Sequence, residues 1–319
     1  MGIYKDFIIF IVGFFIIIKS ADLFTSAAES IAIFFNIPRV VIGLTIVSIA
    51  TTFPEFTVSA LSSYLGQSGI AIGNATGSCL ANIGLILAAA AIIREVSFNP
   101  QVIKRELVFL LAASFLLFFL MWDGSLSFGE GALLLTVFIA FYAYLIRREL
   151  NEARKGKNER AAGDKKYSLG KDVAKFGAGA IGVIACAKWA IIPAAVNIAH
   201  YFKVPEIVIG ITIVAVGTSL PELVTAIIAS VKKMGELALG NVIGANIFNL
   251  LWVLGASSLI KPLAVDRQTR IVTMPLVIVF AVLVFIFTRT QARLSRNEGV
   301  ALFCLYAGYI FYIVKFAYI

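Results

Sequence analysis

Long apolar runs separated by short polar stretches make up almost the whole of this 319-residue chain. Ten of these runs approach or exceed the roughly 20 residues that a helix needs to cross the hydrocarbon core of a bilayer. They cover residues 6–24, 39–63, 69–93, 106–122, 131–146, 174–192, 206–231, 237–260, 271–288 and 299–318. The runs are continuously apolar, whereas the strands of a membrane barrel alternate apolar and polar residues. The pattern therefore predicts an all-α integral membrane protein with ten transmembrane helices.

Composition and charge agree with this prediction. Hydrophobic residues make up 60% of the chain and charged residues 14%, against about 25% charged residues in soluble domains. The one long polar segment, residues 147–175, holds ten Lys/Arg and five Asp/Glu. No aromatic platform interleaves with these charges, so the net charge of +9 does not indicate a nucleic-acid partner.

The basic segment also predicts the orientation in the membrane. Under the positive-inside rule it faces the cytoplasm, and counting spans outward from it places both termini outside. We expect a multi-pass protein of the cell (plasma) membrane, with the lipid bilayer around it and no obligate protein partner evident. The single histidine leaves almost no material for a catalytic triad or a histidine metal centre, so the chain is not expected to be an enzyme.

The chain repeats itself at an offset of 167 residues. Residues 35–58 align on residues 202–225 without a gap, with eleven of twenty-four positions identical, and residues 71–87 align on residues 238–254. Five predicted spans precede the basic segment and five follow it, and an odd number inverts the second copy in the membrane. The fold class is therefore predicted to be two inverted five-helix repeats, an architecture of secondary transporters whose substrate site lies between the halves.

The predicted division of the chain follows from this repeat. A basic cytoplasmic loop separates two five-helix halves, and each half carries one copy of the repeated sequence. The first half is 1–146 with its repeat at 35–89, the loop is 147–173, and the second half is 174–319 with its repeat at 202–256.

Each repeat places a carboxylate directly behind a proline, in the stretches "ATTFPEF" and "GTSLPEL". Pro54 and Pro221 lack the N–H that bonds the carbonyl four residues earlier, so each exposes carbonyl oxygens about one turn before Glu55 or Glu222. A carboxylate at mid-membrane depth costs at least ~2.5–3.5 kcal/mol, which makes a functional role the default hypothesis. Two carboxylates with backbone carbonyls form an all-oxygen shell that suits a hard ion such as Ca²⁺.

Plainer interpretations exist for several of these residues. The prolines can be ordinary kinks, and the G-x-x-x-G spacings can mark close helix packing. Asn82 and Asn249 can serve as hydrogen-bonding links between helices, and Asn74 and Asn241 are expected to support the second helix pair of each half. The mirrored glutamates are harder to explain in this way, because both recur at matching positions in inverted halves.

The motifs "GLTIVSIATTFPE" and "GITIVAVGTSLPE", followed by "GNATGSCLAN" and "GNVIGANIFN", resemble the two α-repeats of the cation/Ca²⁺ exchanger superfamily. The resemblance is closest to the prokaryotic Na⁺/Ca²⁺ exchanger branch. It implies an antiporter that exchanges Ca²⁺ for a monovalent cation, most simply Na⁺, by alternating access and without a cofactor. It implies that Glu55 and Glu222 bind Ca²⁺ with the carbonyls of Thr51 and Thr218. The counter-ion would be bound by Ser48, Thr52, Ser78, Asn82, Ala215, Ser219 and Asn249.

Two departures from the family pattern leave the counter-ion open. Such exchangers often carry an acidic residue at the position of Asn249 and a serine at that of Ala245. Two carboxylates neutralise one Ca²⁺ and leave no charge for additional Na⁺. An H⁺/Ca²⁺ exchanger in which Glu55 and Glu222 carry the protons therefore stays as an alternative, and a cation channel using the same polar residues is a third.

Overall fold

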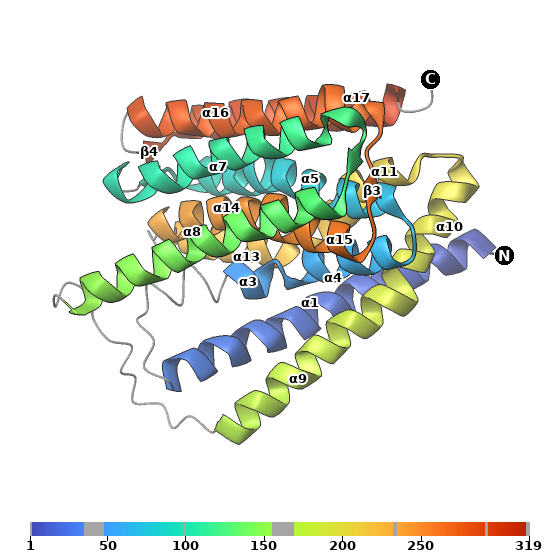
Figure 1. Cartoon of the computed structure of the whole chain (residues 1–319), viewed down its shortest axis with the longest axis horizontal. Helices are drawn as coiled ribbons and strands as arrows, with labels where there is room; N and C mark the ends of the chain where they lie inside the picture. Colours follow the sequence, from blue (N-terminus) through green and yellow to red (C-terminus); the bar gives the residue numbers. More distant parts are fainter. Residues whose placement is uncertain are drawn as a thin grey trace.

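The structure is a computed structural model that describes residues 2–34, 48–97, 100–154, 169–231, 235–290 and 293–316. These residues form a bundle of helices that run side by side along the long axis of the molecule (Figure 1). The N-terminus and the C-terminus lie at the same end of the bundle.

The first half of the chain contributes the following elements: α1 (Gly2–Phe34), α3 (Ser48–Thr51), α4 (Phe53–Tyr64), α5 (Ser68–Ala81), η2 (Asn82–Leu87), α6 (Ala88–Ile93), β1 (Val96–Ser97), α7 (Pro100–Leu120), η3 (Met121–Asp123), β2 (Ser125–Leu126) and α8 (Phe128–Arg154). The segment η2 is a π-helical turn that continues α5 into α6. The segment η3 is a single 3₁₀ turn at the end of α7.

The second half contributes α9 (Leu169–Cys186), η4 (Ala187–Ile191), α10 (Ile192–Phe202), α11 (Glu206–Ile209), η5 (Gly210–Val214), α12 (Ala215–Thr218), α13 (Leu220–Val231), α14 (Gly235–Ile247), η6 (Phe248–Val253), α15 (Leu254–Ile260), β3 (Leu263–Ala264), η7 (Thr269–Thr273), α16 (Met274–Thr290), β4 (Arg293–Leu294) and α17 (Arg296–Phe316). The π-helical segments η2 and η6 occupy matching positions in the two halves, 166 residues apart at their starts and at their ends.

Within the described residues, eight helices are long and apolar enough to cross a membrane, and one bent pair makes a ninth candidate. The bent pair, Ile207–Thr218 with Leu220–Val231, turns by 46° and corresponds to the predicted span 206–231. The predicted span 39–63 lies partly outside the described residues. From Ser48 onward it consists of α3 and α4, which are separated at Thr52.

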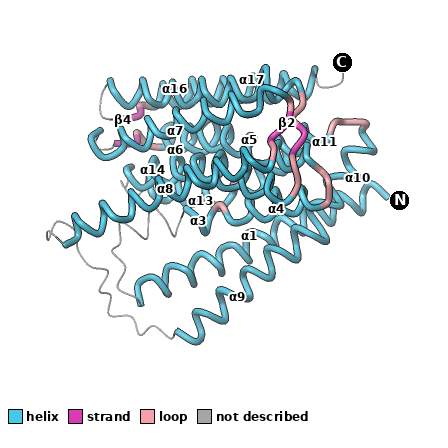
Figure 2. Tube along the Cα trace, viewed as in Figure 1, coloured by secondary structure: helices cyan, strands magenta, loops and turns pink. Residues whose placement is uncertain are grey.

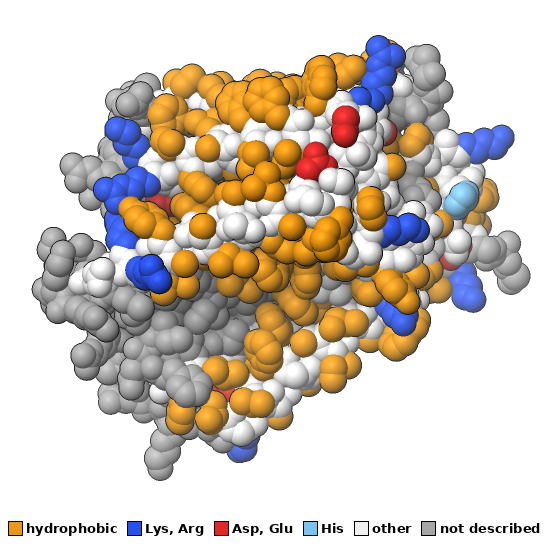
Figure 3. Space-filling view, viewed as in Figure 1, with side chains coloured by type: hydrophobic (Ala, Val, Ile, Leu, Met, Phe, Trp, Pro, Cys, Tyr) orange, Lys and Arg blue, Asp and Glu red, His pale blue; other side chains and the backbone are white. Residues whose placement is uncertain are grey.

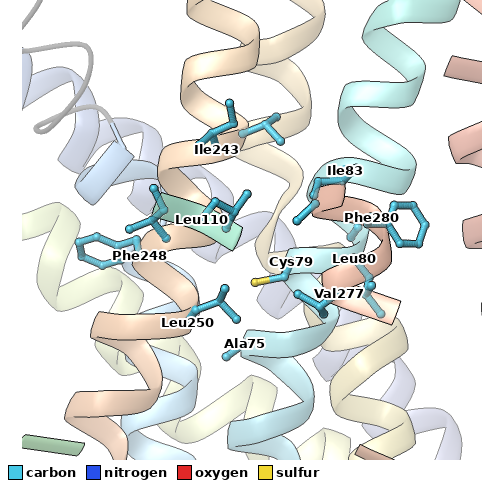
Figure 4. Close-up of a cluster of buried hydrophobic side chains, with 14 of the residues drawn as sticks. Ala75, Cys79, Leu80, Ile83, Leu110, Ile243, Phe248, Leu250, Val277 and Phe280 are labelled. Carbon is cyan, nitrogen blue, oxygen red and sulfur yellow. The ribbon is translucent and has the colours of Figure 1, made fainter. Parts of the chain in front are cut away.

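Two of the candidate spans form the centre of the bundle. In their most apolar windows, 78% of Ser68–Ile93 and 72% of Ala238–Ile260 are buried, against 24–44% for the other unbroken spans. Figure 4 shows the buried side chains that gather around these two spans. Those labelled come from α5, η2, α7, α14, η6 and α16: Ala75, Cys79, Leu80, Ile83, Leu110, Ile243, Phe248, Leu250, Val277 and Phe280. The central helices are therefore held by packing on several sides.

Glycines let the central helix α5 approach the second half closely. A Cβ at Gly73 would come within 2.7 Å of the carbonyl oxygen of Ile207, and one at Gly77 would come equally close to the Cα and carbonyl oxygen of Ile211. Gly210 faces Gly73 in the same way, because a Cβ there would lie 3.1 Å from the Cα of Gly73. The G-x-x-x-G spacing predicted close packing at this place, and the structure confirms it.

Two short antiparallel strand pairs join the halves at opposite ends of the bundle (Figure 2). At one end β1 pairs with β4, with Val96 opposite Leu294. At the other end β2 pairs with β3, with Leu126 opposite Leu263. Val96 and Leu263 are separated by the 167-residue offset of the sequence repeat, so each half offers the corresponding strand to the other.

Two serine side chains in the helices also form hydrogen bonds from one half to the other. The hydroxyl of Ser63 donates to the carbonyl oxygens of Ser257 at 2.7 Å and of Lys261 at 3.2 Å. Ser230, which is 167 residues further on, donates to the carbonyl oxygen of Ala90 at 2.9 Å and to that of Arg94 at 3.2 Å. Each donor and both of its acceptors are related to the other set by the same offset.

The face shown in Figure 3 carries hydrophobic side chains over its middle and lysines and arginines towards its two ends. This distribution fits a protein that is surrounded by lipid along the length of its helices and meets water at both ends.

Candidate ion-binding site

Both proline-glutamate stretches form broken helices. Helix α3 ends at Thr51 and α4 begins at Phe53, while α12 ends at Thr218 and α13 begins at Leu220. The residues at the two breaks have nearly the same backbone angles, with φ −83° and ψ 2° at Thr52 and φ −84° and ψ 8° at Ser219. The breaks therefore occur where the prolines predict them, because a proline two residues later cannot continue the preceding hydrogen-bond ladder.

Each break places a carboxylate in the first turn of a new helix. Glu55 lies in the first turn of α4 and Glu222 in the first turn of α13, where backbone N–H groups and the helix dipole stabilise negative charge. Both side chains are fully buried, at 0% exposure. The break therefore lowers the cost of placing a carboxylate inside the membrane.

The two carboxylates are held by hydroxyl groups from opposite halves. Ser219 donates to Oε1 of Glu55 at 2.9 Å, and Thr52 contacts Oε1 of Glu222 at a long 3.5 Å. Thr52 also donates to the carbonyl oxygen of Ser48 at 2.7 Å, which is its stronger bond. Each carboxylate thus lies beside the break in the other half, and the two face each other across the interface.

Asn74 of α5 forms hydrogen bonds with both broken helices. Its amide nitrogen donates to the backbone oxygen of Glu55 at 3.0 Å and to the hydroxyl of Ser59 at 2.8 Å. Its amide oxygen accepts a bond of 3.1 Å from the hydroxyl of Thr218. The corresponding residue of the second half, Asn241, is buried but neither of its amide atoms has a hydrogen-bond partner among the described residues. The two halves therefore differ at this point, although their sequences match.

Asparagines also meet where the π-helical segments begin. The amide nitrogen of Asn82 donates to the amide oxygen of Asn246 at 2.9 Å, and Asn246 donates to the carbonyl oxygen of Cys79 at 3.2 Å. Asn249 is fully buried, and within the described part of the chain neither of its amide atoms has a partner. Asn82 thus links helices, as one of the plainer interpretations predicts, while its amide oxygen has no partner in the described part of the chain.

The remaining predicted counter-ion residues lie around the breaks. Ser78 approaches the carbonyl oxygen of Ala215 at 3.5 Å, while Thr51 donates to the carbonyl oxygen of Ser48 at 3.3 Å. A Cβ at Gly244 would come within 2.9 Å of the hydroxyl oxygen of Ser48. Ser78 with Ala215, and Gly244 with Ser48, are close contacts between one half and the other.

The buried polar atoms that have no hydrogen-bond partner among the described residues indicate what the arrangement can bind. They include Oε2 of Glu55, Oε2 of Glu222, the amide oxygen of Asn82 and both amide atoms of Asn249. Four of these five atoms are oxygens, and oxygen ligands are what hard cations prefer. Among the described residues no group of three or more His, Cys, Asp or Glu side chains is placed to hold a metal, so the acidic charge of the site comes from two carboxylates.

Sequence reasoning did not single out Asn246. It is 167 residues after Cys79, and the two residues face each other, since Asn246 donates to the carbonyl of Cys79 while the Cys79 thiol lies 3.8 Å from the carbonyl oxygen of Asn246. A signal was present, because Asn246 is a polar residue within an apolar span. Its partner position holds a cysteine, so the repeat alignment alone did not mark it.

Two broken helices around a buried, oxygen-lined site are a feature of secondary transporters. Comparison with known families agrees. The family model described as "Sodium/calcium exchanger protein" matches residues 5–147 and 171–315. The chain therefore belongs to the sodium/calcium exchanger family, a family of transporters and not of enzymes.

Individual relatives cover nearly the whole chain. "Inner membrane protein YrbG" of Escherichia coli is 35% identical over 92% of this chain and 91% of its own length. "Sodium/calcium exchanger MaX1" of Methanosarcina acetivorans is 31% identical over 96% of this chain and 97% of its own length. A solved structure of the sodium-calcium exchanger NCX_Mj superposes with a TM-score of 0.69 at 29% identity, covering 98% of this chain and 99% of that one.

Proposed function

We propose that this protein is a secondary active antiporter that exchanges Ca²⁺ for a monovalent cation, with Na⁺ as the counter-ion. The observation that carries the proposal is the pair of fully buried carboxylates. Each has one oxygen beside a hydroxyl of the opposite half, and its other oxygen has no hydrogen-bond partner among the described residues. Two buried carboxylates that face each other repel unless a cation lies between them. One Ca²⁺ neutralises the pair and fills the free oxygen positions.

Membership of the sodium/calcium exchanger family supports Na⁺ as the counter-ion. Hydroxyl and carbonyl oxygens flank the carboxylates, and these are suitable ligands for Na⁺. We assign the Ca²⁺ position to Glu55 and Glu222 with the carbonyls of Thr51 and Thr218. The flanking counter-ion positions are assigned to Ser48, Thr52, Ser78, Asn82, Ala215, Ser219 and Asn249.

A second candidate, H⁺/Ca²⁺ exchange, has its own support in the site. Asn249 is uncharged, so the site contains two carboxylates and one Ca²⁺ leaves it neutral. Two protons carried by Glu55 and Glu222 would replace one Ca²⁺ without changing the charge of the site. The coupling experiment below separates this candidate from Na⁺ exchange.

The halves are proposed to be inverted repeats, 1–146 and 174–319, joined by the basic segment 147–173, whose ends belong to α8 and α9. The support is that contacts exchange between the halves: the two serine bonding patterns are related by the 167-residue offset, and the two strand pairs correspond to within one residue. Such reciprocal contacts are those of two similar units around a pseudo-twofold axis in the membrane plane.

Alternating access is assigned to sliding of α1 and α9 over the central helices. These two helices pack against each other, with the thiol of Cys186 donating to the carbonyl oxygen of Gly13 at 3.0 Å. Between α1, the η5–α12 segment and α17 lies an apolar cavity of about 500 Å³, lined by side chains that include Phe14 and Val216. The boundary is apolar, so a helix pair that slides along it loses few polar contacts.

The protein is placed in the plasma membrane with its termini outside and the 147–173 loop in the cytoplasm. The support is the surplus of lysine and arginine in that loop and the E. coli relative, which is described as an inner membrane protein. In sealed right-side-out membrane vesicles, protease added to the outside should leave the 147–173 segment uncut.

The proposed exchange is tested by ⁴⁵Ca²⁺ uptake into proteoliposomes that contain the purified protein. One set carries an outward Na⁺ gradient at matched pH, and another carries an outward H⁺ gradient in Na⁺-free buffer. Uptake driven by Na⁺ supports the proposal, and uptake driven by internal acid alone replaces it with H⁺/Ca²⁺ exchange. Ca²⁺ current without any counter-ion gradient would identify a channel.

Three variants connect uptake to the site. Glu55→Gln and Glu222→Gln each keep the shape of the side chain and remove one buried charge, so both should abolish uptake in protein that still folds. Glu95→Gln is the matched control, because Glu95 is exposed and pairs with Arg293 at 2.8 Å; it should transport normally. Near-normal uptake by either site variant would refute the assignment.

A further inference from the structure

A groove with a basic mouth lies between α7 and α8, away from the ion site. Its volume is about 830 Å³. The residues that line it combine two cations with apolar and aromatic side chains: Lys104, Arg105, Val108, Phe109, Ala112, Phe141 and Tyr144.

The mouth of the groove offers donors to an anion. Lys104 and Arg105 are exposed near the start of α7, and Arg105 donates to the hydroxyl of Tyr144 at 3.3 Å. The adjacent carboxylate, Glu106, lies 4.0 Å from Arg148 and does not line the groove. No acidic side chain of the described residues lines it, so its charge is positive.

The floor of the groove is apolar. Phe109 and Phe141 stack face to face with their ring centroids 3.6 Å apart and their planes within 4°. Val108 is 48% exposed beside them, and the small side chain of Ala112 leaves space one turn further along α7. From Lys104 to Ala112 the helix rises about 12 Å into the hydrocarbon region, a length that accommodates part of an acyl chain.

The corresponding positions of the second half show that the charge is particular to this groove. At the 167-residue offset, Lys104 and Arg105 correspond to Ile271 and Val272. The basic mouth therefore belongs to one end of the bundle, the end where β1 pairs with β4. By the charge distribution of the chain this is the cytoplasmic end, where anionic lipids are available and where basic pockets between helices bind their headgroups.

We propose that the α7–α8 groove binds one anionic phospholipid, with the headgroup phosphate at Lys104, Arg105 and Tyr144 and an acyl chain over Phe109 and Phe141. The two parts of the groove match the two parts of this molecule. A soluble anion would use the mouth and leave the apolar floor empty, and a zwitterionic lipid would use the floor with less gain at the mouth. The site is separate from Glu55 and Glu222 and does not depend on which ions are exchanged.

The test is native mass spectrometry of the full-length protein, titrated with phosphatidylglycerol or with phosphatidylcholine of the same chains. The wild type should retain one phosphatidylglycerol more tightly than phosphatidylcholine. Lys104→Gln with Arg105→Gln should weaken that binding roughly 30-fold, since each cation near the membrane surface contributes about fivefold. Ala112→Phe, which keeps both charges and fills the floor, should weaken the binding of either lipid.

A charge-matched control removes two other cations. Lys171→Gln with Lys175→Gln changes the net charge equally on α9, outside the groove, and should leave binding within twofold of the wild type. Equal losses in the two double variants would assign binding to general surface charge and overturn the proposal. Phosphatidylglycerol retained by the groove variants would overturn it as well, as would displacement of the lipid by millimolar glycerol 3-phosphate.

Discussion

Asn74 and Asn241 occupy matching positions of the two repeats, yet the structure predicts different consequences for their loss. Asn74 makes three hydrogen bonds, to Glu55, Ser59 and Thr218, all among buried groups. Asn241 occupies the equivalent position of the second repeat, but its amide atoms have no partner among the described residues. We predict that Asn74→Ala destabilises the protein clearly and that Asn241→Ala does not.

The magnitude follows from the number of bonds. Hydrogen bonds between helices in membrane proteins average ~0.6 kcal/mol, because the unfolded chain in the membrane also finds partners. Three such bonds make Asn74→Ala about 2 kcal/mol less stable, which is a change of roughly 30-fold in the unfolding equilibrium. Asn241→Ala removes an amide that has no hydrogen bond to the described residues, so its change in the free energy of unfolding should be close to zero.

The assay is equilibrium unfolding of the purified protein by increasing SDS in mixed micelles, followed by circular dichroism. The free energy of unfolding is compared for the wild type and the two alanine variants, in Ca²⁺-free buffer so that ion binding does not contribute. Asn74→Ala should also lower ⁴⁵Ca²⁺ uptake in folded protein, because it removes the hydrogen bond that holds the backbone oxygen of Glu55. Equal destabilisation by the two variants would refute the reasoning.

Three further predictions test other parts of the structure. Asn249→Asp adds a carboxylate where the amide has no partner among the described residues, so it should tighten Ca²⁺ binding measured by calorimetry; unchanged affinity would place the side chain outside the ion site. Gly73→Ala should destabilise the protein by about 1–3 kcal/mol, because its Cβ would meet the Ile207 carbonyl at 2.7 Å; Gly177→Ala, with open space around it, is the control in the same SDS titration. Ser63→Ala and Ser230→Ala should each lower the free energy of unfolding by about 1 kcal/mol. A large difference between the two variants in the unfolding assay would contradict the equivalence of their contacts.

Several features of the fold and site were predictable from local physical chemistry. Continuous apolar runs predict membrane helices because unpaired backbone groups are costly in lipid. The helix breaks at Thr52 and Ser219 are predicted by Pro54 and Pro221, since proline removes a backbone donor wherever it occurs. The matching positions of Glu55 and Glu222 in the two halves follow from the sequence repeat.

Other features depend on how the halves meet, and the sequence pattern carries little information about them. That Ser219 donates to Glu55 and that Asn82 donates to Asn246 depends on the crossing of helices more than 160 residues apart in sequence. The basic groove between α7 and α8 likewise exists only once the two helices pack side by side.

By itself, the sequence determined the membrane-spanning class of the protein, its repeat and the positions of the two buried carboxylates. These properties follow from single residues and their spacing along one helix. The tertiary structure alone decided which hydroxyl of the opposite half lies beside each carboxylate. It also decided that Asn74 is hydrogen-bonded while Asn241 has no partner among the described residues. The reason is physical: a hydrogen bond or a close glycine contact forms only when two segments far apart in the sequence are positioned to within a few tenths of an ångström.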